Sequence, residues 1–140
     1  MSWITVVDND YVTMKVSPEK DMIYHTFHQP ISGKVFRDYL NTGVETMKQY
    51  GVTKWLSDDR KNVAIPDEDV EWSTTDWGVR ALEAGWKYWA IVVPEDYAGR
   101  ETMADLRKHY LEKGVELRVF ITPEQAAEWL ETAHLEEDSD

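Results

Sequence analysis

The sequence predicts a single α/β domain with a mixed, mostly parallel sheet of about six strands and about four helices. Three observations predict this class. Early segments alternate with a period of two, and later apolar positions recur at helical spacing. The segment from Trp86 to Val93 is almost continuously apolar, which is typical of a parallel strand covered on both faces. The expected order is βββαβαβαβα over residues 1–135, followed by an acidic tail over residues 136–140.

The first third of the chain predicts three strands in an antiparallel meander. Ile4 to Val7 is a short apolar run, and apolar residues alternate with other types from Tyr11 to Val16. Ser17 to Asp21 has the composition of a turn, and Met22 to Phe27 is rich in aromatic and β-branched residues. Short turns between consecutive strands favour antiparallel pairing.

The middle of the chain then changes to alternating helices and strands. Ser32 is a suitable N-cap for a helix that Gly51 ends, and Val52 to Leu56 is the next strand. Pro66 and the three acidic residues after it favour the start of a second helix, which Gly85 ends. Helices between strands imply right-handed crossovers and a parallel sheet.

The last third continues this alternation. Pro94 breaks the apolar strand, and a third helix is expected from Arg100 to Lys113. Val115 to Ile121 alternates in the way expected of a strand near the edge of the sheet. Thr122 and Pro123 supply an N-cap and a first helical residue for the final helix.

Composition excludes several classes of function. The net charge is −12 and the basic residues are scattered, which argues against nucleic acid and anionic membrane surfaces. No run of about 18 apolar residues is present, so stable membrane insertion is not expected. The absence of cysteine excludes disulfides, cysteine-based zinc sites and thiol chemistry. No signal peptide is evident, so a cytoplasmic location is expected.

The order of elements resembles the STAS domain of bacterial anti-sigma-factor antagonists, and it is also similar to the related CRAL-TRIO fold. The segments from Tyr50 to Asn62 and from Gly85 to Val92 look like uncharacterised bacterial STAS-like proteins. The resemblance implies a non-enzymatic regulatory module that binds a protein partner, or a sensor of a small molecule or lipid. Antagonist STAS domains carry a phosphorylatable serine in an Asp-Ser-Ser-Gly-like motif, in a stretch that corresponds to Ser57 to Asp69. Ser57 is present but the motif is not, and the helix start from Ile65 to Glu68 contains no hydroxyl residue. No phosphorylation site is therefore carried over.

Ligands of open α/β sheets bind beyond the carboxyl ends of the parallel strands. This rule selects segments after the third, fourth and fifth predicted strands. The candidate ligand-binding residues are His28, Ser57, Asp58, Arg60, Asn62, Glu95 and Tyr97. In this interpretation Arg60 holds an anionic group through its planar guanidinium. The alternative is that Asp58 and Arg60 pair with each other and order the loop.

Signatures of catalysis and metal binding are missing. His25 and His28 fall on opposite faces of a strand, which makes them a poor metal pair. The adjacent Asp58 and Asp59 are expected to diverge, and no nucleophile elbow or phosphate loop is present. No metal and no cofactor are therefore expected.

Three functions remain open. A regulatory interaction module predicts an exposed surface with Trp72 and Val79 that binds a partner or a second copy, unless Trp72 packs over the rim of the sheet. A sensor of a small anionic or lipid-like ligand predicts an apolar pocket lined by Trp or Tyr, with Arg60 at its mouth. An enzyme of unknown reaction is the third hypothesis.

Overall fold

Six strands form one sheet whose order in space follows their order in the chain. The computed structural model describes residues 3–137, without the side chains of residues 97, 98, 136 and 137. The strands are β1 (Ile4–Asp8), β2 (Val12–Ser17), β3 (Met22–Phe27), β4 (Lys54–Asp58), β5 (Tyr88–Val92) and β6 (Glu116–Phe120). The first three strands pair antiparallel, and β3 to β6 pair parallel. The predicted α/β class and mixed six-stranded sheet are confirmed.

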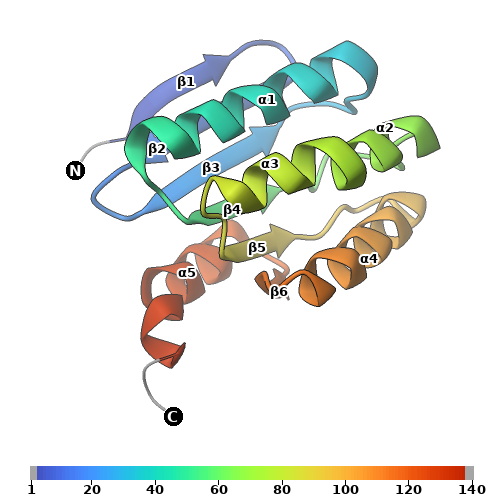
Figure 1. Cartoon of the computed structure of the whole chain (residues 1–140). Coiled ribbons are helices and arrows are strands. Elements are labelled where there is room, and N and C mark those ends of the chain that lie inside the picture. Colours follow the sequence, from blue (N-terminus) through green and yellow to red (C-terminus); the bar gives the residue numbers. More distant parts are fainter. Residues whose placement is uncertain (1–2, 138–140) are drawn as a thin grey trace.

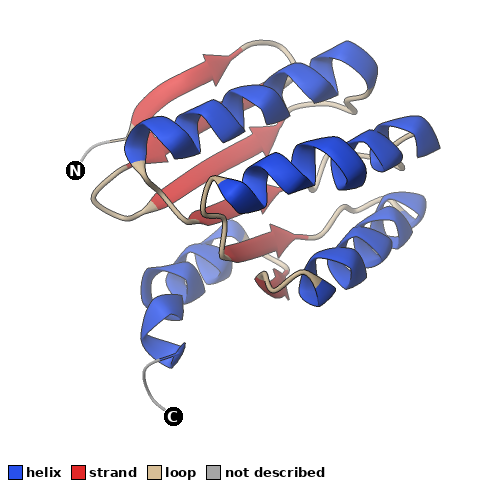
Figure 2. Cartoon of the chain, viewed as in Figure 1, coloured by secondary structure: helices blue, strands red, loops and turns tan. Residues whose placement is uncertain are grey.

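The helices cover the two faces of the sheet unequally (Figures 1 and 2). They are α1 (Gly33–Tyr50), α2 (Asp67–Trp72), the π-helical η1 (Ser73–Trp77), α3 (Gly78–Glu83), α4 (Tyr97–Glu112) and α5 (Pro123–Glu137). The helices α1, α2–η1–α3 and α4 pack together on one face, here called the helix face. On the opposite face α5 packs on β4, β5 and β6.

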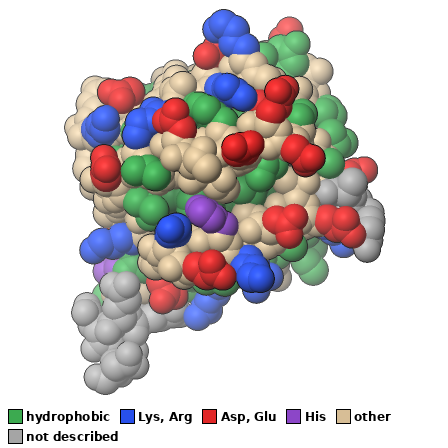
Figure 3. Space-filling model, turned by 45° about the vertical axis from the view of Figure 1, so that its right-hand side comes forward, with side chains coloured by type: hydrophobic (Ala, Val, Ile, Leu, Met, Phe, Trp, Pro, Cys, Tyr) green, Lys and Arg blue, Asp and Glu red, His purple; other side chains and the backbone are tan. Residues whose placement is uncertain are grey.

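Strand alternation explains this asymmetry. In β2, Val12, Met14 and Val16 are fully buried under the helix face, whereas Lys15 points to the other side and is exposed. Because α5 packs only on β4 to β6, the second face of β2 and β3 is only partly covered. Charged residues of both signs are interspersed among hydrophobic ones on the face that Figure 3 presents.

Aromatic rings fill the centre of the helix face. Trp55 lies edge-on to Trp77 with ring centroids 5.6 Å apart, and Trp86 lies 4.9 Å from Tyr110. Gly43 of α1 lies directly against Trp55, and a Cβ there would overlap the indole ring. The small glycine therefore lets α1 approach the sheet closely enough to cover this ring.

A buried lysine anchors α5 to the sheet. The Lys54 ammonium donates to the carbonyl oxygen of Leu130 at 2.6 Å and lies 2.8 Å from His134 Nδ1. Burial lowers the pKa of Lys54, against the carboxylates of Asp21 and Glu131, which raise it. The alternating side chains of β4 thus contact α5 on one face and the aromatic core on the other.

Several boundaries differ from the predicted ones. The third helix begins at Tyr97 instead of Arg100, because the Asp96 carboxylate caps it by accepting from the backbone N–H of Gly99 at 2.8 Å. The predicted second helix contains the π-helical segment η1. Of the predicted acidic tail, residues 136 and 137 end α5, and residues 138–140 lie outside the described residues. None of the described helices has the length and hydrophobicity needed to cross a membrane.

Replacing Gly43 with alanine is expected to destabilise the protein. The added methyl overlaps the Trp55 ring, and overpacking of a filled core costs about 1–3 kcal/mol, which exceeds the gain in helix propensity of about 1 kcal/mol. Urea unfolding of Gly43→Ala measures the loss, with the exposed Glu45→Ala of the same helix as the control. A Gly43→Ala variant as stable as the parent would contradict this packing.

Candidate functional site

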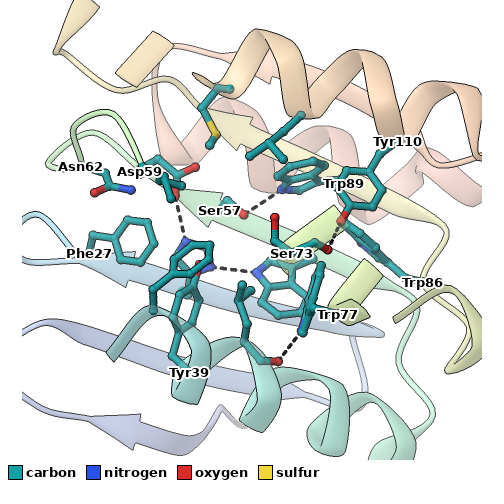
Figure 4. Close-up of a pocket in the computed structure, with 17 residues that line it drawn as sticks. Phe27, Tyr39, Ser57, Asp59, Asn62, Ser73, Trp77, Trp86, Trp89 and Tyr110 are labelled. Atoms are coloured by element: carbon teal, nitrogen blue, oxygen red, sulfur yellow. Dashed lines mark hydrogen bonds and ion pairs between the residues drawn. The ribbon is translucent and has the colours of Figure 1, made fainter. Parts of the chain in front are cut away.

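A cavity of about 50 Å³ lies within the aromatic core, between β3–β5 and the three helices of the helix face (Figure 4). Its walls are mostly aromatic side chains. They include Phe27, Tyr39, Trp77, Trp86, Trp89 and Tyr110. The cavity is therefore an apolar compartment in which a few polar atoms decide what can bind.

A chain of three buried side chains crosses the floor of the cavity. Trp55 Nε1 donates to His25 Nδ1 at 2.8 Å, and His25 Nε2 lies 2.9 Å from Asp59 Oδ1. An indole N–H can only donate, so His25 Nδ1 must be the acceptor. The imidazole proton therefore sits on Nε2, where it is donated to Asp59, and His25 is neutral in this arrangement.

Neighbouring polar groups around the cavity are also hydrogen-bonded. Trp89 Nε1 donates to Ser57 Oγ at 2.8 Å, and the Tyr110 hydroxyl donates to the Ser73 carbonyl oxygen at 2.9 Å. The same carbonyl accepts the backbone N–H of Gly78 across the π-helical turn. Such turns often occur at functional sites, and here η1 turns the Ser73 carbonyl toward α4.

Two buried donors are exceptions. Asn62 Oδ1 accepts from the backbone N–H of Ile31 at 3.3 Å, which leaves Asn62 Nδ2 without a partner among the described residues. Trp86 Nε1 likewise has none there. Asn62 is only 2% exposed and Trp86 only 4%, and both residues line the cavity. An unsatisfied buried N–H costs about 1–3 kcal/mol, so an acceptor within reach of either donor would stabilise the protein.

The electrostatics of the cavity follow from Asp59. Burial, and then the negative charge of Asp59, raise the pKa of Tyr39 well above its usual value. No lysine or arginine of the described residues pairs with Asp59, because the adjacent Arg60 pairs with Asp58 instead. The carboxylate is 3% exposed, so its charge acts on the cavity with little solvent screening.

The predicted polar loop is divided between the two faces of the sheet. Alternation along β4 places Ser57 in the cavity and Asp58 on the opposite side, and the chain then returns Asp59 and Asn62 to the cavity. Arg60 Nε and Nη2 donate to the two carboxylate oxygens of Asp58 at 2.9 and 2.8 Å. This is the pairing that the sequence left open as the alternative, and Arg60 does not line the cavity.

Two of the remaining ligand-site candidates, His28 and Glu95, do not line the cavity. The exposed His28 ring contacts Thr13 Oγ1 at 2.7 Å, on the partly covered face of β2 and β3. Glu95 is exposed, and its backbone N–H donates to the carbonyl oxygen of Arg60. Tyr97 begins α4, and its side chain lies outside the described residues.

The two interface candidates differ in exposure. Trp72 is half-buried and lies edge-on to Phe36 of α1. The guanidinium carbons of Arg37 and Arg80 lie 5.1 and 5.9 Å from the centre of its ring. Trp72 therefore packs against α1 and two cations, while Val79 is 49% exposed.

The arrangement does not support catalysis by His25. One ring nitrogen accepts from Trp55 and the other faces Asp59, so neither is available to take a proton from a substrate. The part of the chain that the structure describes holds no group of three or more His, Cys, Asp or Glu side chains suited to a metal ion.

Sequence reasoning named Ser57 and Asn62 of the cavity but missed His25 and Asp59 as binding residues. His25 was considered only as a metal ligand, and Asp59 only as the neighbour of Asp58. The available signal was strand alternation, since His25 shares its face with the apolar Ile23 and Phe27. A histidine on an apolar face needs a buried partner, but its identity depends on the register between β3 and the end of β4.

Raising the pH above about 10 is expected to destabilise the fold. Burial raises the pKa of Tyr39 and Tyr110 above the usual 10.0, whereas tyrosines of the unfolded chain ionise near about 10. The free energy of unfolding is therefore fully retained below that pH and falls as the pH rises above it. Urea unfolding between about pH 8 and about pH 11 measures this fall, which Tyr39→Phe should reduce. A profile that is unchanged in Tyr39→Phe would contradict the assignment.

Comparison with known proteins gives no relative from which the role of the cavity could be transferred. No protein-family model, no curated protein and no solved structure matches this chain. The function is therefore inferred from the residues of the cavity themselves.

Proposed function

We propose that this domain is a non-enzymatic sensor that binds a small molecule in the cavity of the helix face. The observation that carries the proposal is the pair of buried donors, Asn62 Nδ2 and Trp86 Nε1, which line the cavity without a partner among the described residues. The other indole N–H groups that line the cavity donate to protein acceptors, since Trp55 bonds His25, Trp89 bonds Ser57, and Trp77 bonds the Leu40 carbonyl oxygen at 2.6 Å. A ligand with an acceptor atom beside either donor would offset the cost of burying that donor.

The size of the cavity limits the ligand. Sites for drug-sized molecules occupy about 300–1,000 Å³, whereas this cavity measures about 50 Å³. In this conformation it suits a molecule of a few heavy atoms, or ordered water, and a lipid chain would require the helices to move apart. The lipid-like ligand that the CRAL-TRIO similarity implies is therefore less well supported than a small polar one.

A STAS-like fold and a regulatory role are proposed on separate grounds. The parallel strands follow one another in the sheet, and the three connections between them place their helices on the same face, which is compatible with the STAS-like resemblance.

A protein partner is the second candidate function, favoured by the exposed Val79 and by Ile121, which is 76% exposed beyond the edge strand β6. A cytoplasmic location stays a prediction.

Ligand binding is tested by NMR titration with a panel of compounds of up to about six heavy atoms. We expect a subset to shift the indole N–H signals of Trp55, Trp86 and Trp89 in a saturable way, because these rings line the cavity. Trp129 belongs to α5, which covers the opposite face of the sheet, and serves as an internal control.

A variant with a larger side chain in the cavity provides the control. Leu106 of α4 lines the cavity, so Leu106→Phe should fill it and abolish the shifts. Leu111 lies on the same helix but is 47% exposed, so Leu111→Phe should leave the shifts intact. Shifts that persist in Leu106→Phe, or no saturable shift with any compound, would contradict the proposed function.

A further inference from the structure

The charge balance inside the cavity points to the class of ligand. Asp59 Oδ1 accepts from His25 Nε2, and the donation from Trp55 to His25 Nδ1 keeps the imidazole from carrying a second proton. The histidine thus gives the carboxylate a hydrogen bond but no positive charge. A buried carboxylate without a cation is costly, so the site favours a ligand that supplies one.

The aromatic walls of the cavity also favour a positively charged ligand. The rings of Trp55, Trp77, Trp86 and Trp89 line it together with Tyr110. The π face of an aromatic ring attracts a cation, most strongly for tryptophan, and the attraction is larger when the cation is desolvated. Aromatic rings that line the same cavity as a buried carboxylate therefore favour an ammonium group over a neutral or anionic one.

The two donors without partners add a second requirement. Asn62 Nδ2 and Trp86 Nε1 need an acceptor, which an alkylammonium group alone cannot provide. Asn62 follows Asp59 closely and its backbone N–H donates to the Asp59 carbonyl oxygen, so a donor and a carboxylate adjoin at one end of the cavity. A ligand with both an ammonium and a neutral oxygen matches this combination.

We propose that the ligand is a small amino alcohol of about the size of ethanolamine, whose ammonium group binds Asp59 and whose hydroxyl accepts from a buried donor. This inference rests on the proposed function and goes beyond it by assigning a charge and two polar groups to the ligand. The ligand is therefore cationic, whereas Arg60 led us to expect an anionic one, because Arg60 is paired with Asp58 outside the cavity.

The inference is tested by titrating the full chain with three probes of similar size, ethanolamine, 1,2-ethanediol and acetate. The dissociation constants are read from the Trp86 indole signal. We expect ethanolamine to bind at least about tenfold more tightly than the neutral diol, and acetate to bind most weakly, since a charge-assisted hydrogen bond and cation–π contacts are available only to the amine.

Paired variants then separate Asp59 from general effects of charge. Asp59→Asn should weaken ethanolamine binding at least about tenfold and leave the diol unchanged. Asp58→Asn removes the same charge from the adjacent position on the opposite face and should keep the preference for the amine. If Asp59→Asn does not fold, the order of the three probes in the parent protein still decides the question.

The outcomes distinguish this inference from the proposed function. Equal binding of ethanolamine and the diol, or tighter binding of acetate, would overturn the amino-alcohol assignment while leaving small-molecule binding in place. Failure of all three probes would overturn the assignment as well, and the wider compound panel would then decide whether the cavity binds any ligand.

Discussion

The hydrogen bond from Trp55 Nε1 to His25 Nδ1 is the interaction on which the cavity depends. It joins neighbouring parallel strands through their side chains, and it fixes the tautomer of the imidazole. The tautomer in turn orients the Asp59 carboxylate through His25 Nε2–H and leaves its negative charge unneutralised. The position of a donor-only indole therefore sets the electrostatic character of a cavity formed by three helices and a sheet.

The helices pack tightly around this hydrogen bond, so a cavity with unsatisfied donors is unexpected there. Gly43 lies directly against Trp55, and a Cβ on Gly78 would lie 2.5 Å from the Tyr110 hydroxyl oxygen, so both helices approach the aromatic core as closely as a glycine allows. A core packed this closely rarely keeps unsatisfied donors. Two such donors belong to residues that line the same cavity, and the proposed ligand would offset the cost of burying them.

Much of the fold could be predicted from periodicity, but the site could be predicted only in part. The alternation of Val12, Met14 and Val16 identified a half-buried strand, and Gly51, in the left-handed conformation at the end of α1, was recognised as a helix terminator. The loop after β4 was also predicted to be polar and to hold ligand-binding residues, and two of those residues, Ser57 and Asn62, line the cavity. Its residues were grouped by sequence, whereas the sheet sorts Ser57 and Asp58 to opposite faces. The partner of His25 depends on strand register and loop path, which no local pattern encodes.

The most direct test of this account is the protonation state of the His25 ring, measured by ¹⁵N chemical shifts in a long-range ¹H–¹⁵N correlation spectrum near neutral pH. The account predicts a protonated Nε2 and an unprotonated Nδ1, with a downfield Nδ1 resonance that moves when Trp55 is replaced by phenylalanine. A proton on Nδ1, or an imidazolium with both nitrogens protonated, would contradict it. In that case Trp55 could not donate to His25, and the cavity would not hold the uncompensated carboxylate from which its ligand is inferred.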